Sequence, residues 1–100
     1  MDSQQKKGLL ELMVLASLKY EDSYGYAINQ NINDVMEMSE STLYPILRRL
    51  EKQDLLETYQ TIHNSRVRKY YKITREGLRK LRQSEDDFRE IRKIYDFILR

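Results

Sequence analysis

Residues 39–74 read SESTLYPILRRLEKQDLLETYQTIHNSRVRKYYKIT, and the period of their apolar residues changes at Leu55. Before Leu55, apolar side chains recur at the three-and-four spacing of a helix that buries one stripe, at Leu43, Ile46, Leu47 and Leu50. After it, apolar and polar residues alternate in two runs, as they do in strands, and the polar residues 63–66 between the runs suit a turn. The stretch therefore predicts a helix followed by a β-hairpin.

The predicted helix begins at a serine and ends near Asp54. Ser39 is a good N-cap residue, and Met38 and Leu43 stand where a hydrophobic staple would close. Pro45 lies close to the start of the helix and lacks a backbone N–H. We therefore expect either an irregular first turn or a cap nearer Ser41.

Three further helices are predicted around this stretch. Residues 7–20 are apolar almost all round, a second helix follows the capping residues Asp22 and Ser23, and a third runs from a Thr74 cap to Ile98. Three helices, a hairpin and a long helix make a mainly α, α+β fold in the order of a winged helix-turn-helix. We expect residues 1–75 to form the winged helix-turn-helix and residues 76–100 a C-terminal dimerisation helix, within one structural unit.

Composition narrows the kinds of function open to the chain. One hundred residues make one domain, and the absence of Cys together with a single His, His63, excludes thiolate catalysis and clusters of Cys or His metal ligands. No nucleophile has a basic partner, so we expect neither an enzyme nor a cofactor. The longest apolar stretch, residues 8–18, contains Glu11 and is too short to span a bilayer, and no leader precedes it. The expected location is the cytoplasm.

The outward face of the helix at residues 39–54 suits a nucleic-acid partner. With the apolar stripe turned inward, a rotation of about 100° per residue directs Ser41, Pro45, Arg48 and Lys52 away from the core. Arg49 and Thr42 fall on one flank of that face and Tyr44 on the other. Short hydroxyl side chains near the N-terminus and cations farther along are what a recognition helix needs to reach bases and phosphates.

Charge is unevenly distributed along the chain. The net charge is only +2, yet no Lys or Arg lies between Glu21 and Leu47, whereas the second strand and the following helix are rich in cations. Those cations are Arg66, Arg68, Lys69, Lys72, Arg75, Arg79, Lys80 and Arg82. Interleaved with Tyr70 and Tyr71, they predict a basic stripe that would bind a phosphate backbone with salt-sensitive affinity. A solvated charged face is the plainer alternative.

Four ordered blocks of the chain resemble the signature blocks of the PadR-like transcriptional regulators. They are GLLELMVL at residues 8–15, SYGYAI at 23–28, STLYPILRRL at 41–50 and RKYYKITREG at 68–77. The resemblance implies a winged helix-turn-helix, a homodimer made by the C-terminal helix, and repression through binding of an inverted repeat in double-stranded DNA. It also implies DNA contacts by Tyr24, Ser41, Thr42, Tyr44, Arg48, Arg66, Arg68 and Lys69, to which the outward-face argument adds Arg49 and Lys52.

The chain departs from the family pattern at two turns. The family usually has Gly at the wing tip and after the recognition helix, where this chain has residues 64–65 (Asn-Ser) and Asp54. Asn and Asp tolerate a left-handed backbone, so both turns can still form. Tyr44 also has a second interpretation, in which the ring packs under the helix and only its hydroxyl reaches a phosphate.

The last predicted helix carries an apolar seam at heptad spacing. The seam comprises Leu81, Ser84, Phe88, Ile91, Tyr95 and Ile98, and all but Ser84 are predicted to form the dimer interface. The alternative is packing on the chain's own first helix, and the second apolar edge at Leu78, Ile94 and Phe97 favours a mixture of the two.

Two further hypotheses concern partners. The resemblance implies a cleft at the dimer interface for a small hydrophobic or aromatic effector, with Met13, Phe88, Ile91 and Tyr95 as lining residues. Plain dimer packing of the same residues is the alternative. For the function as a whole, the competing hypothesis is a winged-helix protein–protein interaction module, in which the acidic second helix docks on a basic partner.

Overall fold

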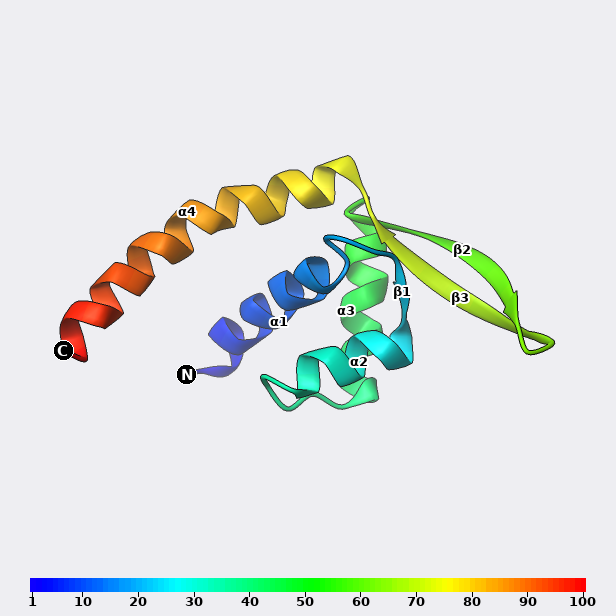
Figure 1. Cartoon of the computed structure of the whole chain (residues 1–100), viewed down its shortest axis with the longest axis horizontal. Coiled ribbons are helices and arrows are strands. Elements are labelled where there is room, and N and C mark those ends of the chain that lie inside the picture. The colour runs from blue at the N-terminus through cyan, green and yellow to red at the C-terminus, as the bar shows by residue number, and fades with distance from the viewer.

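The computed structural model describes all of residues 1–100. Its elements are α1 (Ser3–Ser17), β1 (Ser23–Tyr24), α2 (Gly25–Asn33), α3 (Glu40–Lys52), β2 (Leu56–His63), β3 (Arg66–Ile73) and α4 (Arg75–Ile98). Helices α1, α2 and α3 form a body from which α4 and the β2–β3 hairpin project in opposite directions, so the molecule measures 53 × 27 × 21 Å (Figure 1). This is the predicted winged helix, and we call the β2–β3 hairpin the wing.

One apolar cluster holds the body together. It contains 16 buried side chains drawn from α1, α2, α3, the base of the wing, the first turns of α4 and the loops between them, and no polar or charged residue is buried. The inward stripe predicted for α3, at Leu43, Ile46, Leu47 and Leu50, is buried throughout. Removal of this apolar surface from water is therefore the main force that assembles the body.

Helix α1 is shifted towards the N-terminus relative to the predicted 7–20. Asp2 caps it by accepting a hydrogen bond from the Gln5 backbone N–H at 2.8 Å, and the Gln5 side chain accepts in return from the Asp2 N–H. This capping box starts the helix four residues before Lys7. The helix ends at Ser17, whose hydroxyl donates back to the Val14 carbonyl.

Helix α3 begins at the first of the two predicted caps. Ser39 accepts a hydrogen bond from the Thr42 N–H, so the expectation of a cap nearer Ser41 was wrong. Pro45 lies inside the helix, past the first turn, and removes only one backbone hydrogen bond. Beyond Lys52 the chain reverses at Asp54, which adopts φ 60°, and the Leu55 N–H donates to the Leu50 carbonyl.

The sheet has a third strand that the sequence did not predict. Ser23, expected with Asp22 to cap the second helix, and Tyr24, expected within that helix, instead pair with β3, giving the order β1-β3-β2. Helix α2 consequently starts at Gly25, after Tyr24, which offers no side-chain cap. At the wing tip, where the resembled family usually has glycine, Asn64 and Ser65 both adopt positive φ.

Helix α4 leaves the body after its first turns. Thr74 caps it by accepting from the Gly77 N–H, as predicted, and Leu81 is buried against the core. Beyond residue 86 every side chain is exposed. Leu81, predicted to lie in a dimer interface, belongs instead to the chain's own core, which is the intramolecular part of the mixture expected for the seam.

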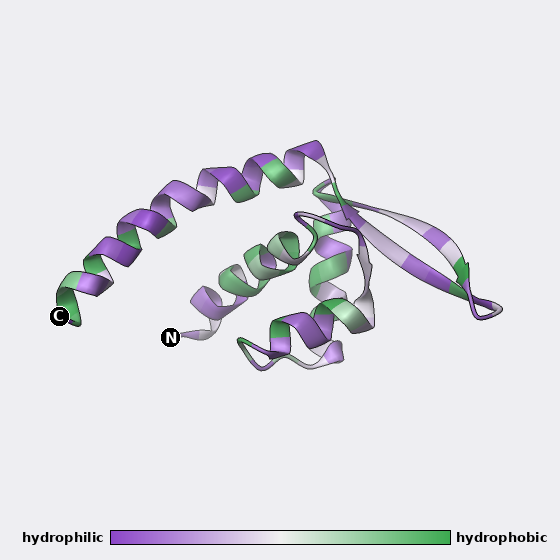
Figure 2. Ribbon diagram, in the orientation of Figure 1, coloured by the Kyte–Doolittle hydropathy of each residue, from purple (hydrophilic) through white to green (hydrophobic).

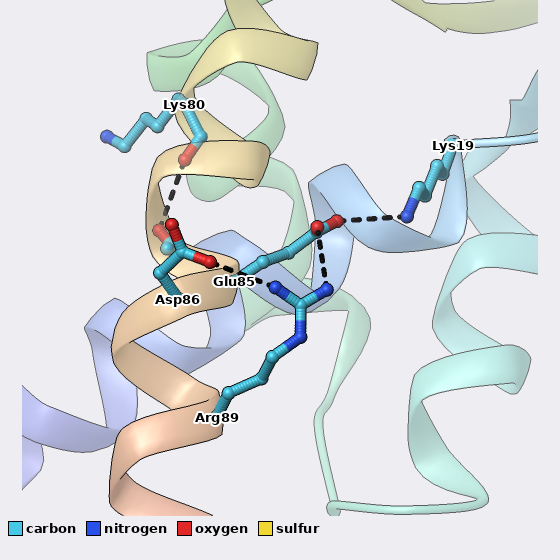
Figure 3. A network of polar contacts seen from close by, with 6 residues as sticks. Lys19, Lys80, Glu85, Asp86 and Arg89 are labelled. Atoms are coloured by element: carbon cyan, nitrogen blue, oxygen red, sulfur yellow. Dashed lines mark hydrogen bonds and ion pairs between the residues drawn. The ribbon is translucent and has the colours of Figure 1, made fainter.

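A polar network marks the point where α4 departs (Figure 3). Lys19 Nζ, just after α1, lies 3.0 Å from Glu85 Oε1, and Arg89 pairs with both Glu85 and Asp86. Ser84 interrupts the apolar seam beside this network, and its hydroxyl donates to the Lys80 carbonyl. The network links α4 to the segment that follows α1. No helix in the chain combines the length and apolarity that crossing a bilayer needs.

Candidate nucleic-acid interface

The outward face of α3 is open to a partner. Ser41, Thr42, Tyr44, Pro45, Arg48 and Lys52 are all exposed, whereas the apolar stripe behind them is buried. We call these six residues the α3 face. Arg48 forms no ion pair within the chain, so its charge is available to an anion.

Three hydroxyl groups gather at the N-terminal end of the α3 face. The Ser39 hydroxyl lies 2.9 Å from that of Ser41 and 3.0 Å from that of Thr42. Each hydroxyl can donate one hydrogen bond and accept two, so the cluster keeps unused capacity toward a phosphate or a base edge. The helix cap thus also holds Ser41 and Thr42 in place.

Arg49 is turned away from the α3 face. Its guanidinium pairs with the Glu11 carboxylate of α1, and the side chain is about one-third exposed. Arg49 therefore links α3 to α1, so the charge of this predicted DNA-contact residue is already paired within the chain. The flank position that the helical rotation assigned to it is what brings it within reach of Glu11.

Tyr44 packs against the chain while part of its side chain stays exposed. The residue is 39% exposed, but its ring lies against the backbone at the start of α2. A Cβ atom at Gly25 would lie 2.8 Å from the Tyr44 hydroxyl oxygen, so glycine permits this close approach. The hydroxyl is held at the junction of α2 and α3.

The wing has two chemically different faces. The register pairs Tyr59 with Tyr70 and Thr61 with Arg68, so these residues share the outer face with Arg66 and Lys72. The inner face carries Thr58, Gln60 and Ile62 of β2 with Val67, Lys69 and Tyr71 of β3. The single basic stripe expected from the sequence is thus divided, because neighbouring strand residues point to opposite faces.

The inner face lies against the C-terminal part of α3. Lys69 Nζ is 3.8 Å from Glu51 Oε1, and the Thr58 hydroxyl donates to the same carboxylate at 3.2 Å. Tyr71, expected among the exposed basic residues, is buried here. Burial raises the pKa of its phenol, as does the charge of Glu51. These contacts with Glu51 hold the inner face of the wing against α3.

The outer face carries a row of tyrosines that sequence reasoning missed. The ring of Tyr70 lies 5.6 Å from that of Tyr24 on β1 and 5.7 Å from that of Tyr59 on β2, centre to centre. The Tyr59 hydroxyl donates to Asp22 at 2.6 Å, and this hydrogen bond raises its pKa to about 12. The alternation of β2 and β3 indicated one shared face, but only the pairing of β1 brings Tyr24 and Asp22 to it.

Arg68 lies over this row. Its guanidinium carbon is 4.0 Å from the centre of the Tyr24 ring, a distance typical of cation–π stacking. Tyr24 and Arg68, predicted separately as contact residues, are therefore one unit. Arg66, beside the turn, is exposed.

A groove of about 870 Å³ separates α1 from α4. It is lined by Leu9, Leu12, Ser84, Phe88, Ile91 and Tyr95, among others. Three of the four residues predicted to line an effector cleft are present. The fourth, Met13, is not among the lining residues and packs against the core cluster instead, because it faces the body from α1.

Comparison with known proteins agrees with this architecture. The model of the family described as "Transcriptional regulator PadR-like family" matches residues 14–83, from the middle of α1 into α4. The chain belongs to this PadR-like family. Members are transcriptional regulators, so the chain is not an enzyme.

The chain also superposes on several solved structures. A PadR-like transcriptional regulator from Bacillus cereus is 31% identical, with 98% of each chain covered and a TM-score of 0.87. A Streptococcus mutans protein is 41% identical over 91% of this chain and 86% of its own, with a TM-score of 0.84. Bacillus subtilis PadR, solved in complex with operator DNA, is 23% identical and shares the fold over 74% of this chain and 45% of its own (TM-score 0.68).

Proposed function

We propose that this PadR-like chain is a sequence-specific DNA-binding repressor that acts as a homodimer on an inverted repeat near a promoter. The observation that carries the proposal is the α3 face lying beside a wing with unshielded cations. In a winged helix, α3 would enter the major groove and the wing would follow the adjacent backbone or minor groove. A neighbour with the same fold was solved with operator DNA, which supports a DNA-binding role.

Particular side chains would divide the work of binding. On the exposed α3 face, base edges or phosphates would be contacted by Arg48, Ser41 and Thr42. Lys52 would contact the phosphates of the adjacent DNA strand. Arg66, Arg68 and Lys69 in the wing would hold the backbone. Tyr24 and Tyr44, whose rings pack inside the protomer, would contribute through their hydroxyl groups or by positioning neighbours.

The dimer would form through α4. Phe88 and Ile91 are each 40% exposed, and Tyr95 and Ile98 are more exposed still, so the chain covers the apolar seam beyond Leu81 only in part. Figure 2 shows hydrophobic segments recurring along α4 between hydrophilic ones out to its C-terminus. A second copy would cover this face and place the two α3 helices at a fixed separation.

A small hydrophobic or aromatic effector would enter the groove between α1 and α4. Leu9, Leu12 and Phe88 supply apolar walls, and the groove shares Phe88, Ile91 and Tyr95 with the proposed dimer seam. Bound there, an effector would change the angle of α4 and so the spacing of the two α3 helices. Aromatic and cationic dyes should quench Tyr emission and raise the melting temperature of the protein. The absence of both effects would leave the groove as ordinary dimer packing.

One observation favours a different function, a protein–protein interaction module. The α2 region carries Glu21, Asp34, Glu37 and Glu40 at its surface without any Lys or Arg. Such an acidic surface could bind a basic protein. Salt dependence separates the two functions, because release of counterions from DNA makes its binding fall steeply with salt.

The decisive experiment uses duplexes selected by the wild-type protein from a random-sequence pool. Affinity is measured by fluorescence anisotropy from about 50 mM to about 200 mM salt. Arg48→Ala should weaken binding and relax the sequence preference, whereas Arg68→Ala should weaken binding to all duplexes and reduce the salt slope by about one. Arg92→Ala on the exposed part of α4 is the matched control. Failure to select any duplex, or indifference to both substitutions, would contradict the proposal.

A further inference from the structure

Two large apolar side chains are exposed at the end of the wing. Ile62 on β2 and Val67 on β3 are directly paired, and they are 81% and 66% exposed. Nothing in the chain covers them. Figure 2 shows this as a hydrophobic segment at the outer end of the hairpin. Single exposed apolar residues are ordinary on protein surfaces, but here two adjoin on one face of a projecting hairpin.

Only cations and polar groups surround the pair. Val67 lies between Arg66 and Arg68 in the strand, and Lys69 follows on the same face. No Asp or Glu occurs between Thr58 and Ile73. A partner that covers the pair must therefore tolerate close cations and offer an apolar surface. The grooves of DNA do both, because phosphates border walls made of deoxyribose C–H groups.

The pair lies on the wing face that packs against α3. Ile62 and Val67 share this inner face with Tyr71, whose register partner Thr58 donates its hydroxyl to Glu51 on α3. From Tyr71 to Val67 the strand advances four residues, or about 13 Å at 3.3 Å per residue. That advance is about the width of the major groove, roughly 12 Å. With α3 in the major groove, the pair would reach the neighbouring minor groove.

We propose that Ile62 and Val67 form an apolar tip that packs against the deoxyribose walls of the minor groove beside the major-groove site of α3. This inference rests on the proposed DNA-binding function and adds to it a contact made without charge. The tip adds affinity that does not depend on salt, because no counterion is released when apolar surface is buried. The tip favours sequences whose minor groove has a suitable width, because deoxyribose walls do not differ between bases.

The test compares an Ile62→Thr/Val67→Thr double variant with wild type on the duplex selected by wild type. Threonine keeps the β-branched shape that strands favour and removes the apolar tip, so the hairpin should be retained. Val35→Thr, at another exposed valine in the turn after α2, is the matched control. Circular dichroism and melting temperature verify that both variants are folded.

We expect the double variant to bind about fivefold to tenfold more weakly, with an unchanged slope of log affinity against log salt. Hydroxyl-radical footprinting, which reports deoxyribose accessibility, should lose protection at the flanking minor groove and keep it around the α3 site. Val35→Thr should match wild type in every measurement.

Three results would overturn the inference. Wild-type affinity and footprint in the double variant would show that the tip touches nothing, and a reduced salt slope would show that phosphate contacts were lost instead. Reduced self-association of the double variant in sedimentation, with unchanged DNA binding, would assign the tip to a contact between copies. If wild type selects no duplex, the DNA-binding function fails first and the tip contact with it. If wild type does select a duplex and the double variant binds it as wild type does, the tip contact is wrong and the DNA-binding function stands.

Discussion

The guanidinium carbon of Arg68 lies 4.0 Å from the centre of the Tyr24 ring, joining the second wing strand to the residue that precedes α2. Tyr70 and Tyr59 extend the row of rings across the sheet, and Asp22 holds the far end through the Tyr59 hydroxyl. A flexible arginine loses rotamer entropy when it binds a phosphate. Arg68 would lose less, because the stack on Tyr24 already orders its side chain.

Tyr24→Leu should weaken binding of the selected duplex about threefold to tenfold, because Arg68 loses the ring that orders it. Tyr24→Phe keeps the ring and should bind nearly as wild type. Anisotropy titrations of the two variants measure the difference. Equal losses in both variants would instead identify the Tyr24 hydroxyl as the contact.

Gly77→Ala should lower the free energy of unfolding by about 1–3 kcal/mol, the usual cost of overpacking. A Cβ atom at this position would press on the Leu55 carbonyl oxygen and lie 2.7 Å from Ile73 Cγ1. Gly8→Ala is the matched control, because a Cβ atom there meets nothing within 4 Å. In mid-helix it should raise the free energy of unfolding by about 0.5–1 kcal/mol. Urea titrations at one protein concentration measure both, and a neutral Gly77→Ala would refute the packing argument.

The Lys19–Glu85 pair should make stability depend on pH at both extremes. The hydrogen bond from Lys19 lowers the pKa of Glu85 below its ordinary 4.5, and the bond to Glu85 raises the pKa of Lys19 above its ordinary 10.5. The contribution of Glu85 is therefore complete above pH 4.5 and is lost as pH falls through the lowered pKa. The contribution of Lys19 to stability is complete below pH 10.5 and is lost as pH rises through the raised pKa.

Glu85→Gln should accordingly lower the melting temperature by a constant amount between roughly pH 6 and 9, and the deficit should disappear in strong acid. Adding Lys19→Gln to Glu85→Gln should cost little more, since the pair is already broken. Thermal melts across pH test both statements. A deficit that persists unchanged in strong acid would show that Glu85 acts by packing alone.

Ile91→Asp should convert the proposed dimer to a monomer, because an unpaired carboxylate in an apolar seam loses its hydration. Gln83→Asp adds the same charge at an exposed position off the seam and should leave the dimer intact. Light scattering after gel filtration reports the mass of each variant. A dimer mass retained by a folded Ile91→Asp variant would place the interface elsewhere.

Apolar periodicity and capping residues predicted most of the helices and strands, because each of these signals depends on only a few neighbouring residues. The change of period at Leu55 separated α3 from the wing, and the Ser39 and Thr74 caps were correct. Strand β1 was missed because two residues carry no period, and Ser23 has the composition of a helix cap. Its pairing with β3 is a long-range contact that no local signal encodes.

Sequence by itself determined the order of the four helices and the hairpin, the buried stripe of α3 and the exposed positions on its opposite side, because helix and strand periods assign each residue to a face. Only the tertiary structure decided which cations are unshielded and which are engaged. Arg49 forms an ion pair with Glu11 on a helix that is distant in sequence. The pleat divides the wing cations between two faces, and Arg68 stacks on the Tyr24 ring of the edge strand. Those partners lie far away along the chain, so packing alone brings them within reach.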